Sequence, residues 1–157
     1  MANIEASWHQ PVFLVDGSEN RLPYSIDNSE TLPEEPGVYV FCRMYGEKVI
    51  PLYIGKALNI RKRVCSHLKT NVRLMHGIRE SGTGKYIVLA CTVVTGPGRR
   101  VLTMLNTLER GLIENALSEG YELLNIQLTK LKVHRIEFSR NRTVEKMLPR
   151  TMLVRAA

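Results

Sequence analysis

Two short tyrosine-bearing segments joined by a tight turn constrain the fold of this chain more than any other feature. The first contains Gly37-Val38-Tyr39, the second contains Tyr53-Ile54-Gly55-Lys56, and Tyr45-Gly46-Glu47 lies between them. Runs rich in β-branched and aromatic residues on either side of a glycine turn predict a β-hairpin. A basic helix is expected directly after it, so one compact unit supplies phenol, ammonium and guanidinium groups. Those groups are suited to binding a phosphodiester.

The register of this hairpin decides where the two phenols lie. With the turn centred on Gly46, Tyr39 is opposite Tyr53, with side chains on one face and Cβ atoms about 5 Å apart. Taken by itself, that arrangement favours an ordinary aromatic cross-strand pair, which strands prefer in any case, over a functional site. Pro51 cannot donate a hydrogen bond to the ladder, and it therefore requires the second strand to be an edge strand or to carry a bulge.

The remaining elements follow from hydrophobic period and from glycine and proline positions. They predict an α/β class domain, a small α+β sandwich with helices packed on a mixed, largely antiparallel sheet. The chain divides into an acidic arm (1–35), a main domain (36–127) and a basic C-terminal extension with one strand (128–157). Strands are expected near residues 11–15, 37–43, 49–54, 86–94 and 133–138, and helices near residues 58–69, 72–80 and 101–119.

Length and composition limit the class of protein. A chain of 157 residues fits one domain. We find no leader pattern, and the longest apolar run, 86–94, is far shorter than the ~20 residues of a membrane helix, so we expect a cytoplasmic protein with no membrane partner. The three cysteines are widely spaced and are expected to be small buried residues, and the four histidines show no metal-ligand spacing.

The charge is unevenly distributed. The net charge is +7, but residues 1–36 contain seven acidic residues and one arginine, which leaves a strongly basic remainder. No Asp or Glu occurs from Lys48 through Arg79, a stretch with eight lysines and arginines. A block of one sign attracts polyanions, and nucleic acid is the obvious candidate. A solvated basic surface, or a patch for an anionic membrane, explains the charge alone equally well.

The basic helix has a core-facing stripe with cations beside it. Its apolar residues recur every four positions: Ile60, Val64 and Leu68. Arg63 and His67 flank this stripe on one edge, where they could face a cleft, whereas Arg61 and Lys62 point toward solvent or distant phosphates. For Arg63 a solvated position and a functional one are equally supported, and for His67 the helix pattern alone favours the solvated one.

The long helix carries a carboxylate on its apolar face. That face is defined by Leu105, Leu112 and Ala116, and Glu109 falls on it. Such a carboxylate is costly unless a cation or hydrogen-bond donors meet it. A buried ion pair is one explanation, and a ligand for Mg²⁺, which commonly takes one or two carboxylates with waters and phosphate oxygens, is the other. Glu114 lies beside Arg110 on a more polar face and is expected to be solvated.

The order of these motifs resembles a known family. The motifs are Gly37-Val38-Tyr39, Tyr53-Ile54-Gly55-Lys56, Arg63, Leu108-Glu109-x-x-Leu112-Ile113 and Leu124-Asn125. Together they resemble the signature of the GIY-YIG nuclease superfamily over about residues 36–126. The resemblance implies a small α/β nuclease that cuts DNA phosphodiesters with one divalent metal, Mg²⁺ or Mn²⁺. The segment between Glu109 and Asn125 is longer than in similar members.

The resemblance also implies catalytic roles. Tyr39 is expected to be the general base, with Lys56 close enough to favour its phenolate. Tyr53 is expected to contact the scissile phosphate or a bound water, Arg63 to stabilise charge on the phosphoryl group, and Glu109 to hold the metal. A free tyrosine has a pKa of ~10, so nearby positive charge is needed for it to act as a base at neutral pH.

Five further residues are expected at the substrate. Gly55 would allow close approach of the backbone, and Asn125 would support the site by hydrogen bonds. His67 matches a histidine that only some members have, and Arg61 and Lys62 would contact phosphates.

The sequence thus predicts a metal-dependent DNA endonuclease. A non-cleaving nucleic-acid-binding module on the same fold is the alternative, and a basic protein-interaction domain on which the acidic arm docks is a third. Dimerisation would suit double-strand cutting, but no sequence feature identifies a dimer interface.

Overall fold

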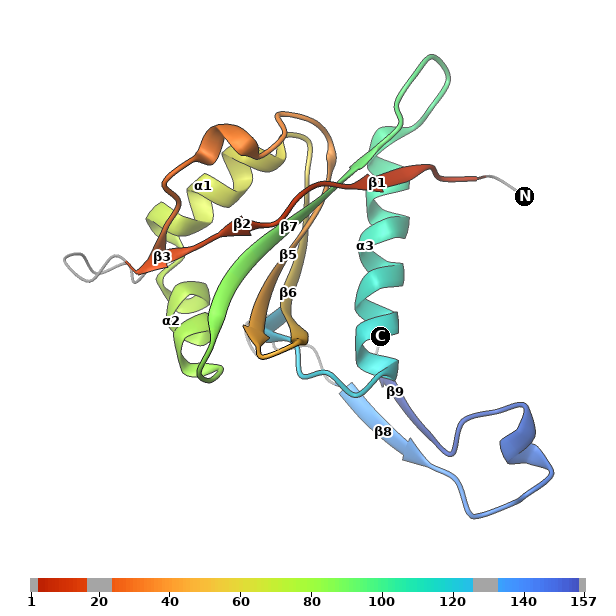
Figure 1. Ribbon diagram of the computed structural model, residues 1–157. Helices are drawn as coiled ribbons and strands as arrows, with labels where there is room; N and C mark the ends of the chain where they lie inside the picture. The colour runs from red at the N-terminus through yellow and green to blue at the C-terminus, as the bar shows by residue number, and fades with distance from the viewer. Residues whose placement is uncertain (1–2, 17–23, 126–132, 156–157) are drawn as a thin grey trace.

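The computed structural model describes residues 3–16, 24–125 and 133–155 of the chain. It shows a central antiparallel sheet with helices on both faces, and a separate two-stranded hairpin at the C-terminal end (Figure 1). The expected α/β class is confirmed.

Three long strands form the body of the sheet. β5 (Gly37–Tyr45) lies between β6 (Lys48–Ala57) and β7 (Lys85–Val93), and every pairing is antiparallel. β1 (Ala6–Trp8) and β2 (Val12–Phe13) both pair with β7 on its other side. In the order β1-β7-β5-β6 the second tyrosine strand, β6, is therefore an edge strand.

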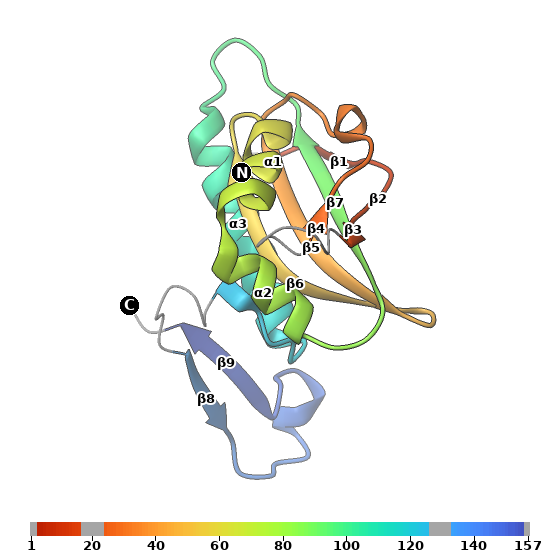
Figure 2. The same ribbon diagram turned by 90° about the vertical axis from the view of Figure 1, so that its left-hand side faces the viewer.

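The helices cover opposite faces of this sheet. α1 (Ile60–Thr70) and α2 (Val72–Glu80) lie on one face, and α3 (Val101–Ser118) lies on the other (Figures 1 and 2). The expected stripe of α1 is buried as a whole: Ile60, Val64 and Leu68. The side chain of Asn59 accepts a hydrogen bond from the backbone N–H of Lys62 and so caps the start of α1.

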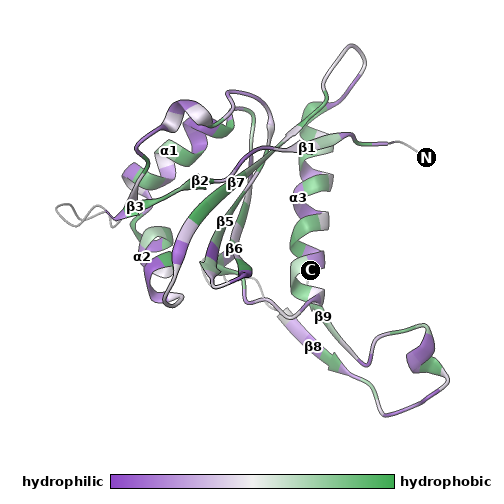
Figure 3. Cartoon of the chain, viewed as in Figure 1, coloured by the Kyte–Doolittle hydropathy of each residue, from purple (hydrophilic) through white to green (hydrophobic). Residues whose placement is uncertain are grey.

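The alternation of β5 divides the core into two clusters. Tyr39 and Phe41 pack with the residues of α1 and α2, whereas Val40 and Cys42 pack with those of α3. All four are buried, as expected for a central strand with helices on both faces, and the strands of the body are hydrophobic in Figure 3. Neighbouring residues of one strand thus reach different chemical environments.

The hairpin register differs from the prediction. Tyr39 is paired with Gly55, and Tyr53 is paired with Phe41, so the predicted Tyr39–Tyr53 pair was wrong. The register shifts between Phe41 and Cys42, next to the position where Pro51 pairs with Cys42. Pro51 is thus accommodated by an edge strand and a bulge together, as its missing N–H requires. The bulge moves every later partner in β6 relative to a simple hairpin.

The acidic arm contributes to the sheet as well as covering it. Beyond β1 and β2, it forms a small ladder of β3 (Val15–Asp16) with β4 (Tyr24–Ser25), then a 3₁₀ turn, η1 (Ser29–Thr31). Leu32 is 1% exposed and belongs to the core under α1. The arm is therefore integrated into the main domain rather than appended to it.

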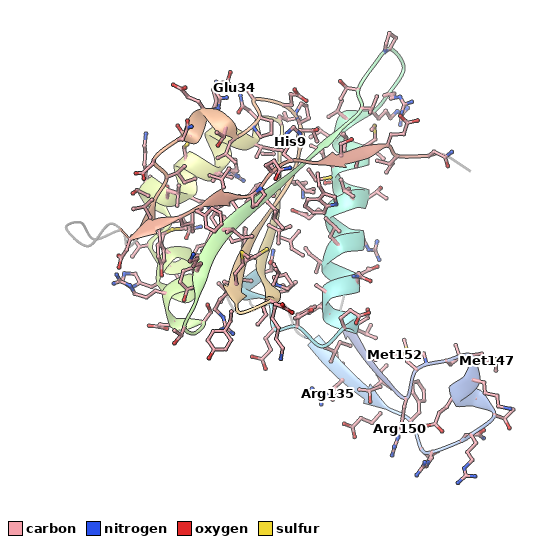
Figure 4. The ribbon with its side chains drawn as sticks, viewed as in Figure 1. His9, Glu34, Arg135, Met147, Arg150 and Met152 are labelled. Atoms are coloured by element: carbon pink, nitrogen blue, oxygen red, sulfur yellow. The ribbon has the colours of Figure 1, made fainter. Side chains whose placement is uncertain are left out.

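The C-terminal extension forms a hairpin of its own. β8 (Val133–Glu137) pairs with β9 (Thr151–Arg155), with the 3₁₀ turn η2 (Val144–Lys146) in the connection. β8 was expected, but β9 was not, because its segment lacks a clear polar–apolar alternation. Leu153 packs against the α3 side of the core, whereas Met147, 72% exposed, lies at the projecting end (Figure 4).

Two other expectations bear on the class of protein. Cys42 and Cys91 are buried free thiols, and burial raises the pKa of Cys42 to about 12, so they act as small core residues. Among the helices that the structure describes, none is long and apolar enough to cross a membrane.

Candidate active site

The edge strand β6 presents side chains to both faces of the sheet near its C-terminal end. After the bulge, Tyr53 packs on the side of α1 and α2, and Ile54 packs on the side of α3. Lys56, two residues after Ile54, reaches α3 and contacts Glu109 there. Among the described residues, no strand pairs with β6 on its outer side, so this edge of the sheet leaves a route between the two faces.

On the side of α1, three rings form a compact aromatic group. The hydroxyl oxygen of Tyr39 lies 2.7 Å from Nε2 of His67. The rings of Tyr39 and Tyr53 stack with centroids 6.4 Å apart and an interplanar angle of 28°. The His67 ring meets Tyr53 edge-on at a centroid distance of 5.7 Å. The two phenols therefore share one site, although they are not direct cross-strand partners.

Asn71 fixes which nitrogen of His67 carries the proton. Its side-chain oxygen accepts from the backbone N–H of Leu74 and caps α2, so its amide NH₂ must face Nδ1 of His67, 3.0 Å away. Nδ1 is therefore an acceptor, and in the neutral ring the proton is on Nε2. His67 thus donates its Nε2–H to the hydroxyl oxygen of Tyr39.

The pKa values agree with this neutral, buried group. Burial, with help from the charge of Arg63, lowers the pKa of His67 to about 4. Burial also raises the pKa of Tyr39 well above its ordinary range, the neighbouring Tyr53 adds to this, and Arg63 partly opposes it. The pKa of Tyr53 is raised as well, first by burial and then by Glu109. Without added positive charge, both phenols are neutral at neutral pH.

Gly55 makes room for the ring of Tyr39. A Cβ at position 55 would overlap the hydroxyl oxygen and Cζ of Tyr39, so no other residue fits there unless the ring or the strand moves. Since Tyr39 and Gly55 are cross-strand partners, the phenol lies directly over the glycine backbone. The family resemblance implied that Gly55 permits close approach of the backbone at the substrate, and in the structure Gly55 also accommodates the ring of Tyr39.

On the side of α3, an ion pair joins the hairpin to the long helix. Nζ of Lys56 lies 2.7 Å from Oε1 of Glu109, and the two side chains are 37% and 21% exposed. This cation explains how Glu109 is tolerated on the packed face of α3. Lys56 was expected beside Tyr39, but the hydrogen bond that it makes is to Glu109. Glu114 pairs with Arg110 on the exposed face, as expected.

Asn125 is hydrogen-bonded to the backbone of the edge strand β6 at Ile54, between Tyr53 and Gly55. Its side-chain oxygen accepts from the backbone N–H of Ile54 at 2.9 Å, and its NH₂ donates to the carbonyl of Ile54 at 2.6 Å. The side chain of Asn125 thus satisfies both backbone hydrogen-bonding groups of Ile54, as a neighbouring strand would, and fixes the backbone between Tyr53 and Gly55. Its expected supporting role has a specific structural basis here.

The three remaining candidates on α1 differ in position. Arg63 is exposed, and its charge affects the pKa values of Tyr39, Tyr53 and His67, which places it at the aromatic group. Arg61 binds the acidic arm instead, through the carbonyls of Leu32 and Glu30. Lys62 is exposed at the start of α1 and lines a cleft with Lys56 and Arg63.

The donor set for a metal is small. In the parts of the chain that the structure describes, no three His, Cys, Asp or Glu side chains converge on one point. Glu109 is nevertheless a half-buried carboxylate next to the phosphate-binding candidates, and only its Oε1 is bonded to Lys56. Mg²⁺ and Mn²⁺ are commonly bound through one or two carboxylates, waters and phosphate oxygens, so the residues fit such an ion.

Sequence reasoning missed Asn71 and undervalued His67. Asn71 could have been identified as the residue between two helices, four residues after His67, where a capping amide also reaches back to the imidazole. His67 was favoured as a solvated residue because helix periodicity cannot show the tertiary contact with Tyr39. Both belong to the site by geometry.

Comparison with known proteins finds a short similar segment. A 40-residue segment is 60% identical to excinuclease cho of Escherichia coli and covers 25% of this chain and 12% of that protein. A 42-residue segment is 50% identical to UvrABC system protein C of Gluconobacter oxydans and covers 27% of this chain and 6% of that protein. No family model and no solved structure matches the chain.

The similarity defines the class of the segment rather than of the whole chain. The chain spans only a small fraction of the length of these relatives, 12% or less in the matched regions. A nuclease-like segment of the excinuclease type is therefore present, in line with the GIY-YIG resemblance of the motifs.

Proposed function

We propose that this protein is a metal-dependent endonuclease that hydrolyses phosphodiester bonds in DNA. The proposal rests on the position of two pairs of side chains on either side of the C-terminal end of β6. The neutral group joins Tyr39 to His67, and the charged group joins Lys56 to Glu109. Similarity to excinuclease cho supports the reaction class, and the basic block supports the substrate.

In the proposed mechanism, each group acts at a different atom. Tyr39 first gives up its own proton to solvent, and His67 stabilises the resulting phenolate by donating Nε2–H to it. The phenolate then takes a proton from the attacking water, directly or through Tyr53, and becomes a phenol again. Arg63 offers a forked set of donors to the non-bridging phosphate oxygens. Gly55 and Asn125 hold the two strands in the arrangement that brings these groups together.

Glu109 would hold the divalent cation, Mg²⁺ or Mn²⁺. The ion would supply positive charge that stabilises the leaving oxygen and lowers the pKa of groups around it. This charge matters here, because burial raises the pKa of Tyr39. The ammonium of Lys56 would then be released from Oε1 of Glu109 and would become available for a phosphate oxygen.

The proposal is tested by cleavage of supercoiled, linear and branched DNA by the purified protein, with Mg²⁺ or Mn²⁺ and with a chelator. Glu109→Gln keeps the size of the side chain and removes its charge. We expect cleavage to fall at least ~100-fold while DNA binding remains. The matched control is Glu114→Gln on the same helix, where an exposed pair with Arg110 is lost and activity should stay the same.

The results separate the alternatives. Metal-dependent cleavage that is lost in Glu109→Gln and kept in Glu114→Gln supports the enzyme. Binding without cleavage on every substrate would instead establish the non-cleaving module. If Glu109 serves only as an ion-pair partner, Glu109→Gln should lower the melting temperature without a selective loss of catalysis.

A further inference from the structure

A cleft lies beside the candidate active site, past the end of the edge strand. It has a volume of ≈ 440 Å³, within the ~300–1,000 Å³ range of small-molecule sites. Its walls come from three elements: the end of β6 with the following loop, α1, and the first turn of α3. Lys56 and Arg63 belong both to this cleft and to the site described above.

Part of the cleft wall is apolar but exposed, and it does not belong to the hydrophobic core. Leu58, in the loop before α1, and Leu102, in the first turn of α3, are each 59% exposed and line it. Leu105, 1% exposed, lies behind them as part of the core. Two large leucines from separate elements thus expose apolar surface to one cavity. An apolar, flat body would cover that surface.

The same cleft is positively charged. Its lining contains Lys56, Lys62 and Arg63 and no acidic residue. Within the described residues, neither Lys62 nor Arg63 forms an ion pair with a carboxylate, so both cations are available to an anion. Asn59 and Ser66 add polar groups at the wall. A ligand for this cleft therefore combines an apolar body with negative charge.

We propose that the cleft binds one unpaired nucleotide of a DNA strand, with its base against Leu58 and Leu102 and its phosphate at Lys62 and Arg63. The proposal rests on the proposed function, because the strand must also pass the candidate active site. A paired base is stacked on both faces and cannot enter, and taking it out of the stack costs a few kcal/mol. An unpaired nucleotide avoids that cost.

With this role, the cleft selects which DNA structures the protein binds and cuts. DNA with unpaired nucleotides next to the cut phosphate, such as a flap, a bubble or a branch, is expected to be bound and cut in preference to an intact duplex. The charge of the cleft favours any DNA, whereas its leucines favour exposed bases. The preference should therefore depend on the leucines and the overall affinity on the cations.

The test uses the intact chain in the absence of divalent metal. Single-stranded oligonucleotides with one 2-aminopurine, and a duplex of the same length, are titrated with protein, and the fluorescence of the base analogue is followed. Burial of the base in the cleft should change its fluorescence. Leu102→Ala and Leu58→Ala should each weaken single-strand binding about tenfold, because each removes part of the apolar surface that is buried against the base.

The matched control is Leu148→Ala. Leu148 is 55% exposed, similar to Leu102, but it lies in the C-terminal extension and lines no part of the cleft. Circular dichroism checks folding, which substitution of such exposed leucines should preserve. The control is expected to bind like the wild type.

Several results would overturn the cleft assignment. These are equal losses of single-strand and duplex binding in Leu102→Ala, an unchanged affinity in both leucine variants, or the same loss in Leu148→Ala. Failure of the proposed function gives a different result. If no DNA is cut with metal, but binding of the aminopurine strand still depends on Leu58 and Leu102, the endonuclease is rejected and the nucleotide cleft stands.

Discussion

The two faces of the central sheet carry chemically different groups of side chains next to the same edge strand, β6. On the face of α1 and α2, the buried Tyr39 and the half-buried Tyr53 and His67 form a group with no formal charge. On the face of α3, Lys56 and Glu109 form a half-exposed ion pair. Alternation along β6 assigns its residues to one face or the other, so this strand supplies Tyr53 to the first group and Lys56 to the second.

The difference between the faces shows how a chain can place a proton acceptor near a metal-ligand candidate. Burial of a phenol opposes ionisation, and burial of a carboxylate requires a cation. Separating them by the thickness of an edge strand lets each have its own partner, Nε2–H of His67 and Nζ of Lys56. The neutral face is the more informative one to disturb first, because its contact between Tyr39 and His67 could not be predicted from the motifs.

The largest effect is expected from Tyr39→Phe. It removes the hydroxyl that accepts from His67 and keeps the ring that fills the core over Gly55. Loss of a general base costs about 10²–10⁴-fold in rate, so cleavage under single-turnover conditions should fall by that factor while DNA affinity changes little. Tyr45→Phe, at a position 59% exposed, is the control and should be fully active. Equal activity of the two variants would show that the neutral face has no catalytic part.

The next prediction concerns His67 and pH. In the folded state its pKa is lowered from the ordinary 6.5 to about 4, mainly by burial. Between pH 6.5 and about 4, His67 therefore binds a proton in the unfolded chain but not in the folded chain. The contribution to stability is present above pH 6.5 and is lost as pH falls through this window, by up to about 3 kcal/mol.

Comparison with His67→Gln isolates this term, because the other histidines titrate in both proteins. The free energy of unfolding is measured with urea between pH 4 and pH 8. The advantage of wild type over the variant should shrink as pH falls. A constant difference across the range would mean that His67 is not held in a neutral form.

A smaller loss is expected from Gly55→Ala. The new Cβ would meet the Tyr39 ring, so the strand or the ring must move, at a cost of about 1–3 kcal/mol. Gly111→Ala in α3 is the matched change with the opposite sign, since no atom lies within 4 Å of its Cβ position and alanine favours a helix by about 1 kcal/mol. Thermal and urea unfolding should show these opposite shifts. If Gly55→Ala is neutral, the ring does not depend on the glycine.

The sequence was sufficient for the elements and for one side of the site. Alternation, turn residues and helical period predicted β5, β6, β7 and the three helices. The position of Glu109 on an apolar stripe indicated that a cation or a metal must meet it, and Lys56 is the cation in this structure. Such features depend on local spacing, which a sequence displays directly.

The rest depended on contacts that spacing does not encode. Two shifts of one residue changed the partner of Tyr39 from Tyr53 to Gly55: the turn pairs Tyr45 with Lys48, and the bulge near Pro51 adds one more residue to β6. The bond between Tyr39 and His67 joins residues on a strand and a helix, and helix period shows only that His67 lies beside the core stripe. In the arm, a strand was expected near residues 11–15, where the structure has β2 and β3, but β1 and β4 were not expected. The pairing of β1 and β2 with β7 could not be predicted.

The smallest effect on stability is expected from Asn71→Asp, which should change the position of the proton on the His67 ring. In Asn71→Asp the side chain can still accept from the N–H of Leu74, so the cap of α2 is retained. Its second oxygen, however, accepts where the amide NH₂ donated to Nδ1 of His67. The imidazole proton should therefore move to Nδ1, and the hydroxyl of Tyr39 would have to donate to Nε2 instead of accepting from it.

Nitrogen-15 chemical shifts of the His67 ring report this directly, and Asn71→Ser, which keeps a capping oxygen without an amide donor, is the control. Stability should change by less than about 1 kcal/mol in both variants, because serine and aspartate are both good capping residues. Cleavage should fall in Asn71→Asp more than in Asn71→Ser, since only the carboxylate forces the tautomer that cannot stabilise a Tyr39 phenolate. If the ring keeps its proton on Nε2 in Asn71→Asp and cleavage is unchanged, the neutral face is held by packing around Tyr39, and the hydrogen-bond chain from Asn71 is incidental.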